Sequence, residues 1–293
     1  MSSKAKVQKK LVAWIENESA ASKRVFERLK LELPRLQEKL SHKRVHDSRV
    51  ALRHFFALWP VLCDDGWDQN DFESTVVKPL ERLLKKLGKV RDTDVNIEIA
   101  KNELACPNSR IRKWKETRRQ YKRKLKKELK SVNVNKLLLR MERFFAEQTT
   151  TVSERVADSA LGKEETETHV LAALQRQEHV VRALAQQPST PCEFHKLRLA
   201  IKQWRYLLDD LCNSNNMQLE EIQESLGKLH DLDRIKPLLQ GDERLITSLA
   251  NLNSIHQKLL FELFDVEKKL PFGFNPLNQD AKSRTTTRKS SAR

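Results

Sequence analysis

Two segments of the chain share a spacing of histidine, arginine and lysine that could bind an anion. The first reads His-x-x-Arg-x-x-x-Arg over residues 46–53, and the second reads His-x-x-Arg-x-x-x-Lys-x-x-Arg over residues 195–205. On a helix, steps of three and four residues at 100° each place these groups within a stripe about 80° wide. Such a stripe can be neutralised only by an anion or by several carboxylates. Its occurrence twice predicts one site built from two halves.

Apolar residues flank both stripes, for example Val45, Val50 and Leu52 in the first and Leu197 and Ile201 in the second. A run of this kind is usually a solvated basic face on an amphipathic helix. The apolar flanks favour a second interpretation, in which the cations emerge at the margin of a core and a lower dielectric strengthens their attraction to an anion. The second stripe would extend for roughly 15 Å along its helix, which suits a chain of phosphates better than a single one.

A second string repeats after each stripe. It reads Leu-Gly-Lys-Val-Arg-Asp-Thr-Asp at 87–94 and Leu-Gly-Lys-Leu-His-Asp-Leu-Asp at 226–233, with five of eight positions identical. Each half should therefore be one helical bundle, and a pseudo-twofold axis should relate the pair, because repeated units usually bury their cores against each other. We expect Gly88 and Gly227 to permit close approach of two helices.

Each string carries paired aspartates, which could point to acid–base or metal chemistry. Asp94 and Asp233 map to the apolar side of their helices, whereas Asp92 and Asp231 point away from it. We favour a supporting role for Asp94 and Asp233, in which each hydrogen-bonds and orients nearby arginine and lysine side chains.

The positive charge is concentrated. The formal net charge is +16, yet residues 110–130 alone hold 12 lysines and arginines against 2 glutamates. A basic patch of this kind is typical of a surface that binds a polyanion. Ser109 is a candidate N-cap for this helix, and Ile111, Trp114, Tyr121, Leu125, Leu129 and Val132 define its core face. Arg118 lies within that arc, Lys115 and Lys122 lie at its edge, and Arg119 projects further out. For the first three, a surface role and a binding role are equally compatible with the pattern.

Composition predicts an all-α protein. Only 6 glycines and 9 prolines occur in 293 residues, and apolar residues recur at three- and four-residue spacing without period-2 alternation. We expect an N-terminal helical half over 1–160, a C-terminal helical half over 161–274, and a disordered basic tail over 275–293. The four scattered cysteines form no zinc or disulfide pattern, and the apolar runs are too short to span a bilayer. A soluble, intracellular protein is therefore expected.

Motifs for catalysis are missing from the sequence. It contains no G-x-S-x-G, H-E-x-x-H or P-loop. The remaining histidines lack metal-ligand spacing and suit ordinary core or surface positions: His54, His169, His179, His230 and His256. We accordingly expect no enzyme activity, no catalytic residue, no metal and no cofactor.

The segments Val45–Arg53 and Phe194–Tyr206, with the strings at 87–94 and 226–233, resemble the CHAD family, which is named for its conserved-histidine α-helical domain. The likeness extends from about residue 20 to 270. It implies two four-helix bundles about a pseudo-twofold axis, enclosing a basic groove or pore that binds inorganic polyphosphate without catalysis. Weaker binding of other polyanions, such as inositol phosphates or nucleic acid, is expected, and membrane binding is not. The cytoplasm, a polyphosphate-rich compartment and the nucleus are all compatible locations.

The resemblance transfers a set of basic positions onto this sequence: His46, Arg49, Arg53, His195, Arg198, Lys202 and Arg205. Further candidates for polyphosphate binding are His42, Lys43, Lys86, Lys89, Lys115, Arg118, Arg119, Lys122 and Lys228. One departure matters, because the first stripe has Phe56 where the second has Arg205. The two halves should therefore grip the anion unequally.

Two alternatives remain. The 110–130 helix and the basic tail favour a nucleic-acid-binding module, although its stacking aromatics would lie on predicted core faces. A metal-dependent phosphohydrolase would need clustered carboxylates and histidines.

Overall fold

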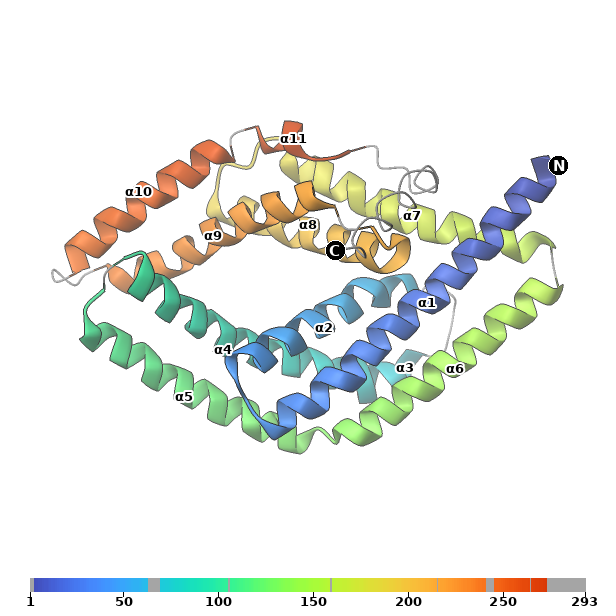
Figure 1. The fold of residues 1–293 in the computed structure, drawn as a ribbon, viewed down its shortest axis with the longest axis horizontal. Coiled ribbons are helices and arrows are strands. Elements are labelled where there is room, and N and C mark those ends of the chain that lie inside the picture. Colours follow the sequence, from blue (N-terminus) through green and yellow to red (C-terminus); the bar gives the residue numbers. More distant parts are fainter. Residues whose placement is uncertain are drawn as a thin grey trace, which may run out of the picture.

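The computed structural model describes residues 3–62, 69–104, 106–158, 160–214, 216–240, 245–263 and 265–272. Within these ranges the chain is almost entirely helical and contains no strand (Figure 1), which confirms the all-α class. The elements are α1 (Ser3–Glu38), α2 (His42–Leu62), α3 (Gln69–Phe72), a π-helical turn (Glu73–Val77), α4 (Lys78–Asn102), α5 (Asn108–Ser131), α6 (Val134–Asp158), α7 (Ala160–Ala185), α8 (Pro191–Cys212), α9 (Met217–Leu239), α10 (Ile246–Glu262) and α11 (Val266–Lys269).

One local prediction differs from the structure. Ser109 is not the cap of the basic helix, because α5 begins at Asn108 with Pro107 in the N-cap position and no side-chain cap. The fixed φ of proline suits the start of a helix. The tail expected to be disordered, 275–293, lies outside the described residues.

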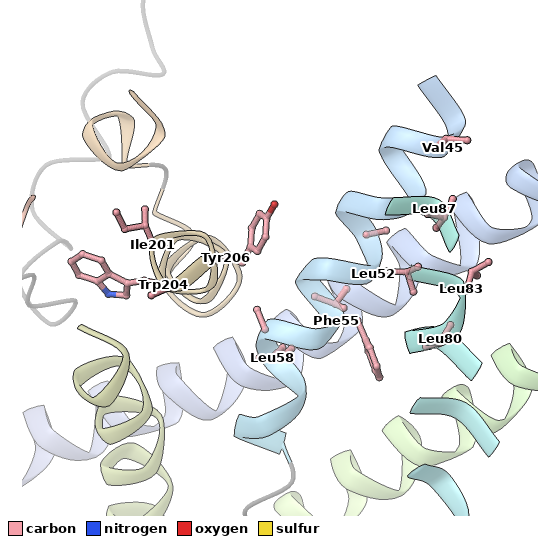
Figure 2. Close-up of a cluster of buried hydrophobic side chains, with 14 of the residues drawn as sticks. Val45, Leu52, Phe55, Leu58, Leu80, Leu83, Leu87, Ile201, Trp204 and Tyr206 are labelled. Carbon is pink, nitrogen blue, oxygen red and sulfur yellow. The ribbon is translucent and has the colours of Figure 1, made fainter. Parts of the chain in front are cut away.

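The two stripe helices, α2 and α8, lie side by side near the middle of the molecule (Figure 1). Figure 2 shows Tyr206 of α8 directed toward α2, while Ile201 and Trp204 lie on the opposite side of α8. On the other side of α2, Leu52 and Phe55 pack near Leu83 of α4 in one buried core. Each stripe helix therefore packs its apolar side into the core. Its cations lie on a different side of the helix.

A buried polar contact joins the two stripe helices. His54 of α2 and Asp210 of α8 are only 5% and 6% exposed, and Nδ1 of the histidine lies 2.7 Å from Oδ2 of the aspartate. The His54 ring also lies 4.2 Å from that of Tyr206, centroid to centroid, and Arg24 of α1 donates to the Asp210 carbonyl. Because an unpaired buried polar group is costly, this contact favours one relative placement of α2 and α8.

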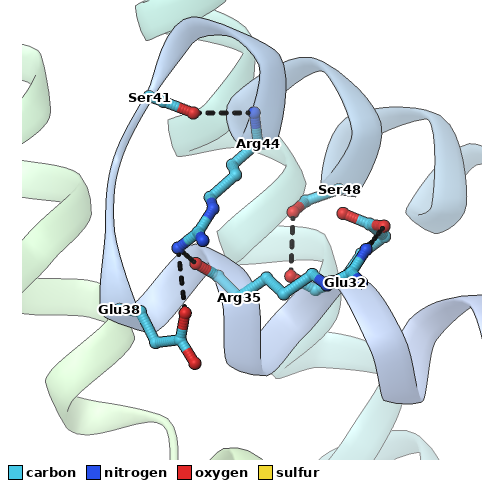
Figure 3. Close-up of polar contacts among 6 residues, drawn as sticks. All are labelled: Glu32, Arg35, Glu38, Ser41, Arg44 and Ser48. Atoms are coloured by element: carbon cyan, nitrogen blue, oxygen red, sulfur yellow. Dashed lines mark hydrogen bonds and ion pairs between the residues drawn. The ribbon is translucent and has the colours of Figure 1, made fainter.

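The crossing of α1 and α2 is set by hydrogen bonds that Figure 3 shows. Nη1 of Arg44 donates to the carbonyl of Arg35 at 2.6 Å and to the Glu38 carboxylate at 3.1 Å. The hydroxyl of Ser48 donates to the carbonyl of Glu32 at 3.3 Å. Arg44 is thus committed to α1, although it lies in sequence among the candidate cations of α2.

Helix α8 begins at a capping box. The Thr190 hydroxyl accepts from the backbone N–H of Glu193, and the Glu193 carboxylate accepts from the backbone N–H groups of Ser189 and Thr190. These hydrogen bonds lower the pKa of Glu193 to about 2. Asn213, in the left-handed conformation with φ 48°, ends the helix. Both ends of the second stripe helix are therefore defined locally.

Replacing Thr190 with alanine should lower the free energy of unfolding by about 1 kcal/mol, because the substitution removes the N-cap of α8. Urea denaturation measures this change. Ser109→Ala is the matched control, since Ser109 is exposed and caps no helix. Equal losses in the two variants would contradict the role of Thr190.

Candidate functional site

A cavity of about 450 Å³ lies between α2, α4, α8 and α9 and is lined by cations from both stripes. Three carboxylates, Asp92, Glu224 and Asp231, also line it. The basic lining residues are more numerous: His46, Arg49, Arg53, Arg91, Arg198, Lys202, Arg205 and Lys228. The positive charge of the walls therefore exceeds the negative charge.

Two arginines of the cavity, one from each stripe, have an unpaired buried nitrogen among the described residues. Arg198 is only 8% exposed, and Nε of both Arg49 and Arg198 is buried with no hydrogen-bond acceptor among the described residues. Burial and the nearby Arg53 lower the pKa of Arg198, and the same causes lower the pKa of Arg49 to about 10. Both groups remain cationic at neutral pH, so the cavity holds buried positive charge that an anion would stabilise.

Lys202 is the most perturbed cation in the cavity. Its pKa falls to about 6, first because of burial and then because Arg198, Arg53 and Arg49 repel its charged form. Asp231 opposes this shift but does not overcome it. Lys202 is therefore largely neutral at pH 7 in the unliganded protein, and a bound anion would favour its charged form.

The histidines of the two stripes differ in their surroundings. Burial is the main cause that lowers the pKa of both His46 and His195. His195 stacks on His230 with ring centroids 4.3 Å apart and a separation of 3.1 Å between the two Nδ1 atoms. Burial and Arg198 lower the pKa of His230 to about 3, so it stays neutral. His230 is thus not the isolated histidine that its sequence context indicated.

The aspartates that line the cavity are Asp92 and Asp231, which sequence reasoning passed over. Arg234 donates to the carbonyl of Asp92 at 2.9 Å and lies 3.4 Å from a carboxylate oxygen of Asp231, which ties α4 to α9. The repeat offered a usable signal, since both aspartates occupy the same place in the two strings. Sequence reasoning also passed over Arg91 and Arg234.

The other two aspartates have other partners. Asp94 is buried and forms an ion pair with Arg118 of α5, an arrangement that can orient the guanidinium. Asp233 instead lies 2.7 Å from Nε2 of His256 on α10. The two equivalent positions thus serve different neighbours.

The structure does not bring all candidate cations together. Within the described residues, none from α5 lines the central cavity. Instead His42, Lys115, Arg118 and Arg119 line a separate groove. Among the described residues, α5 therefore adds no wall to this cavity, because it packs on the outer side of α4. Five more candidates line neither hollow: Lys43, Lys86, Lys89, Lys122 and His195.

Arg205 and Phe56 occupy equivalent positions in the two stripes but have different contacts. Arg205 binds residues of α9, and Phe56 packs within α2. Arg205 donates from Nε to Gln223 at 3.1 Å and from Nη1 to Glu220 at 3.2 Å. Phe56 packs edge-on against Phe55, with ring centroids 5.2 Å apart. Because Glu220 offsets the charge of Arg205, the second stripe gains less from its extra cation than its sequence indicates.

The glycines of the repeated strings do not mark close helix contacts, contrary to expectation. A Cβ added at Gly227 would meet nothing within 4 Å, and one at Gly88 would lie 3.8 Å from the Arg49 guanidinium, which is ordinary contact. Gly227 lines the central cavity. Its missing side chain therefore leaves space in the cavity rather than between helices.

Two features of the described residues bear on other functions. No group of three or more His, Cys, Asp or Glu there is arranged to hold a metal ion. No helix in that part of the chain combines the length and apolarity needed to cross a membrane.

The fold and cavity define an all-helical domain with a basic hollow between two similar stripe helices. The chain belongs to the CHAD domain family, whose model matches residues 20–240. The crystal structure of the CHAD domain from the plant Ricinus communis has the same fold, with a TM-score of 0.56 and 17% sequence identity. That match covers 88% of this chain and 87% of the plant chain. No curated protein matches significantly.

Proposed function

We propose that this protein binds inorganic polyphosphate in the central cavity and catalyses no reaction on it. The observation that carries the proposal is the pair Arg49 and Arg198, which line one cavity and each have a buried Nε with no hydrogen-bond partner among the described residues. Membership of the CHAD family supports it, because polyphosphate binding is a general property of the family. The excess of cations over carboxylates in the lining supports it further.

Binding would rest on charge-assisted hydrogen bonds to non-bridging phosphate oxygens. Arg49, Arg53 and Arg198 could each donate in bidentate fashion, and Lys202 would act as a point charge. Asp92 and Asp231 line the same cavity, and both favour the charged form of Arg198. We further propose that the halves 1–160 and 161–274 form two bundles about a pseudo-twofold axis, each contributing one stripe.

Affinity for polyphosphate should fall steeply as salt rises. If about six cations release counterions, the association constant drops by about three-hundredfold to a thousandfold between roughly 50 and 200 mM salt. Isothermal titration across this range measures the slope. An affinity that barely changes would contradict an electrostatic site.

Competition separates this proposal from nucleic-acid binding. At matched phosphate concentration, polyphosphate should displace labelled single-stranded RNA or DNA, whereas nucleic acid should displace labelled polyphosphate poorly. The reverse order would favour a nucleic-acid module. Phosphate release from polyphosphate in the presence of Mg²⁺ or Mn²⁺ would indicate a hydrolase instead.

A further inference from the structure

A second basic hollow lies beside the central cavity. It is a groove of about 490 Å³ between α4 and α5, reached also by the start of α2. Two carboxylates, Asp94 and Glu98, face its cations, and Asp94 is already paired with Arg118. Its basic lining residues are His42, Lys101, Lys115, Arg118 and Arg119.

The groove and the cavity are lined by successive turns of the same two helices. On α2, His42 lines the groove and His46 lines the cavity, a distance of roughly 6 Å along the axis. On α4, Arg91 lines the cavity, whereas Glu98 and Lys101 line the groove. The two hollows are therefore neighbours along one path.

A single contact stands between them. Nη1 of Arg91, from the cavity, lies 2.8 Å from Nε2 of His42, from the groove. Because an arginine can only donate, Nε2 of the histidine is the acceptor in this contact. The dividing contact thus consists of two basic side chains and presents no carboxylate to a passing anion.

Among the described residues, three cations of the groove have no partner beyond their own helix. Lys101 and Lys115 are exposed and have no partner among the described residues, and Arg119 pairs only with Glu116 one turn away on its own helix. Lys122 lies beside them, and burial together with Arg118 lowers its pKa. Cations crowd this face of α5, and a polyanion would relieve their repulsion.

We propose that a long polyphosphate chain runs from the central cavity past Arg91 and His42 into the groove between α4 and α5, so that the protein binds long chains more tightly than short ones. This inference rests on the proposed function of the cavity. A triphosphate has too few phosphate groups to occupy both hollows, and a long linear chain can fill them together. The groove would then set the preference for chain length.

The test compares two ligands and two double variants of the full chain. Lys101→Gln with Lys115→Gln removes two groove cations from different helices. Lys113→Gln with Lys124→Gln removes the same charge from exposed positions on α5 that line neither hollow. Affinity for triphosphate and for a long-chain polyphosphate is measured by isothermal titration at one salt concentration.

The groove variant should bind long-chain polyphosphate about tenfold more weakly, while its affinity for triphosphate stays within twofold of the wild type. The control variant should change neither affinity by more than about twofold. Equal losses in both variants, or an equal loss for both ligands, would overturn the inference and leave the cavity proposal standing. A wild-type protein that binds neither ligand would instead overturn the proposed function, and the inference with it.

Discussion

Replacing Arg49 and Arg198 together with glutamate should abolish polyphosphate binding. The double variant places two carboxylates where the cavity has two guanidinium groups, each with a buried Nε that lacks a hydrogen-bond partner among the described residues. Each change removes bidentate donors and adds repulsion to the phosphate chain, so we expect a loss of at least about a thousandfold in affinity. Isothermal titration or fluorescence competition measures it.

Two further measurements make this result interpretable. Arg28→Glu with Lys258→Glu makes the same charge change at exposed positions outside the cavity, and it should retain most of the affinity. Circular dichroism and thermal unfolding show whether the cavity variant still folds. The milder pair Arg49→Gln with Arg198→Gln should lose a smaller but still large share of binding. Full affinity in a folded glutamate variant would show that the two stripes do not form one site.

Polyphosphate binding should be accompanied by proton uptake near neutral pH, and Lys202 should be its main source. In the free protein the pKa of Lys202 is about 6, because the side chain is buried and Arg198, Arg53 and Arg49 surround it. A bound polyanion raises that pKa, so affinity should weaken by close to tenfold per pH unit as pH rises above 6. Below about pH 6 Lys202 is already charged, and its contribution should level off.

Titrations in buffers of different ionisation enthalpy count the protons taken up at pH 7.5. The matched variant is Lys202→Arg, which keeps a cation that does not titrate in this range. It should bind with much less proton uptake and a flatter pH profile above pH 6. His46 and His195 should still steepen binding at lower pH, since burial lowers the pKa of both. An unchanged proton count in Lys202→Arg would assign the uptake to another group.

Local sequence was sufficient to predict the helices and their repeated stripes. The spacing of His46, Arg49 and Arg53 defines one face of a helix whatever surrounds it, because the angle between residues is fixed by the backbone. The same reasoning placed Trp114, Leu125 and Leu129 of α5 on a buried face, as the structure has them. Whether a segment forms a helix, and which residues share one face of it, depend on residues close in sequence, so both could be predicted.

Helix packing, in contrast, determines which cations share a hollow. Periodicity along α4 places Asp92 and Asp94 on different faces of that helix. Only the packing of α9 beside α4 brings Asp92 and Asp231 to one cavity, where Arg234 contacts both. Likewise, α5 carries the densest positive charge of the chain and yet contributes nothing to the central cavity, because α4 lies between them.

The stripe that indicates an anion site can thus be read from the sequence alone. The same is true of its repetition and of the resemblance to the CHAD family. The site itself arises from the way α2 and α8 pack. This packing leaves a buried Nε without a partner among the described residues on both Arg49 and Arg198, and it makes Lys202 largely uncharged. Burial and the approach of like charges depend on residues about 150 positions apart, which no local pattern encodes.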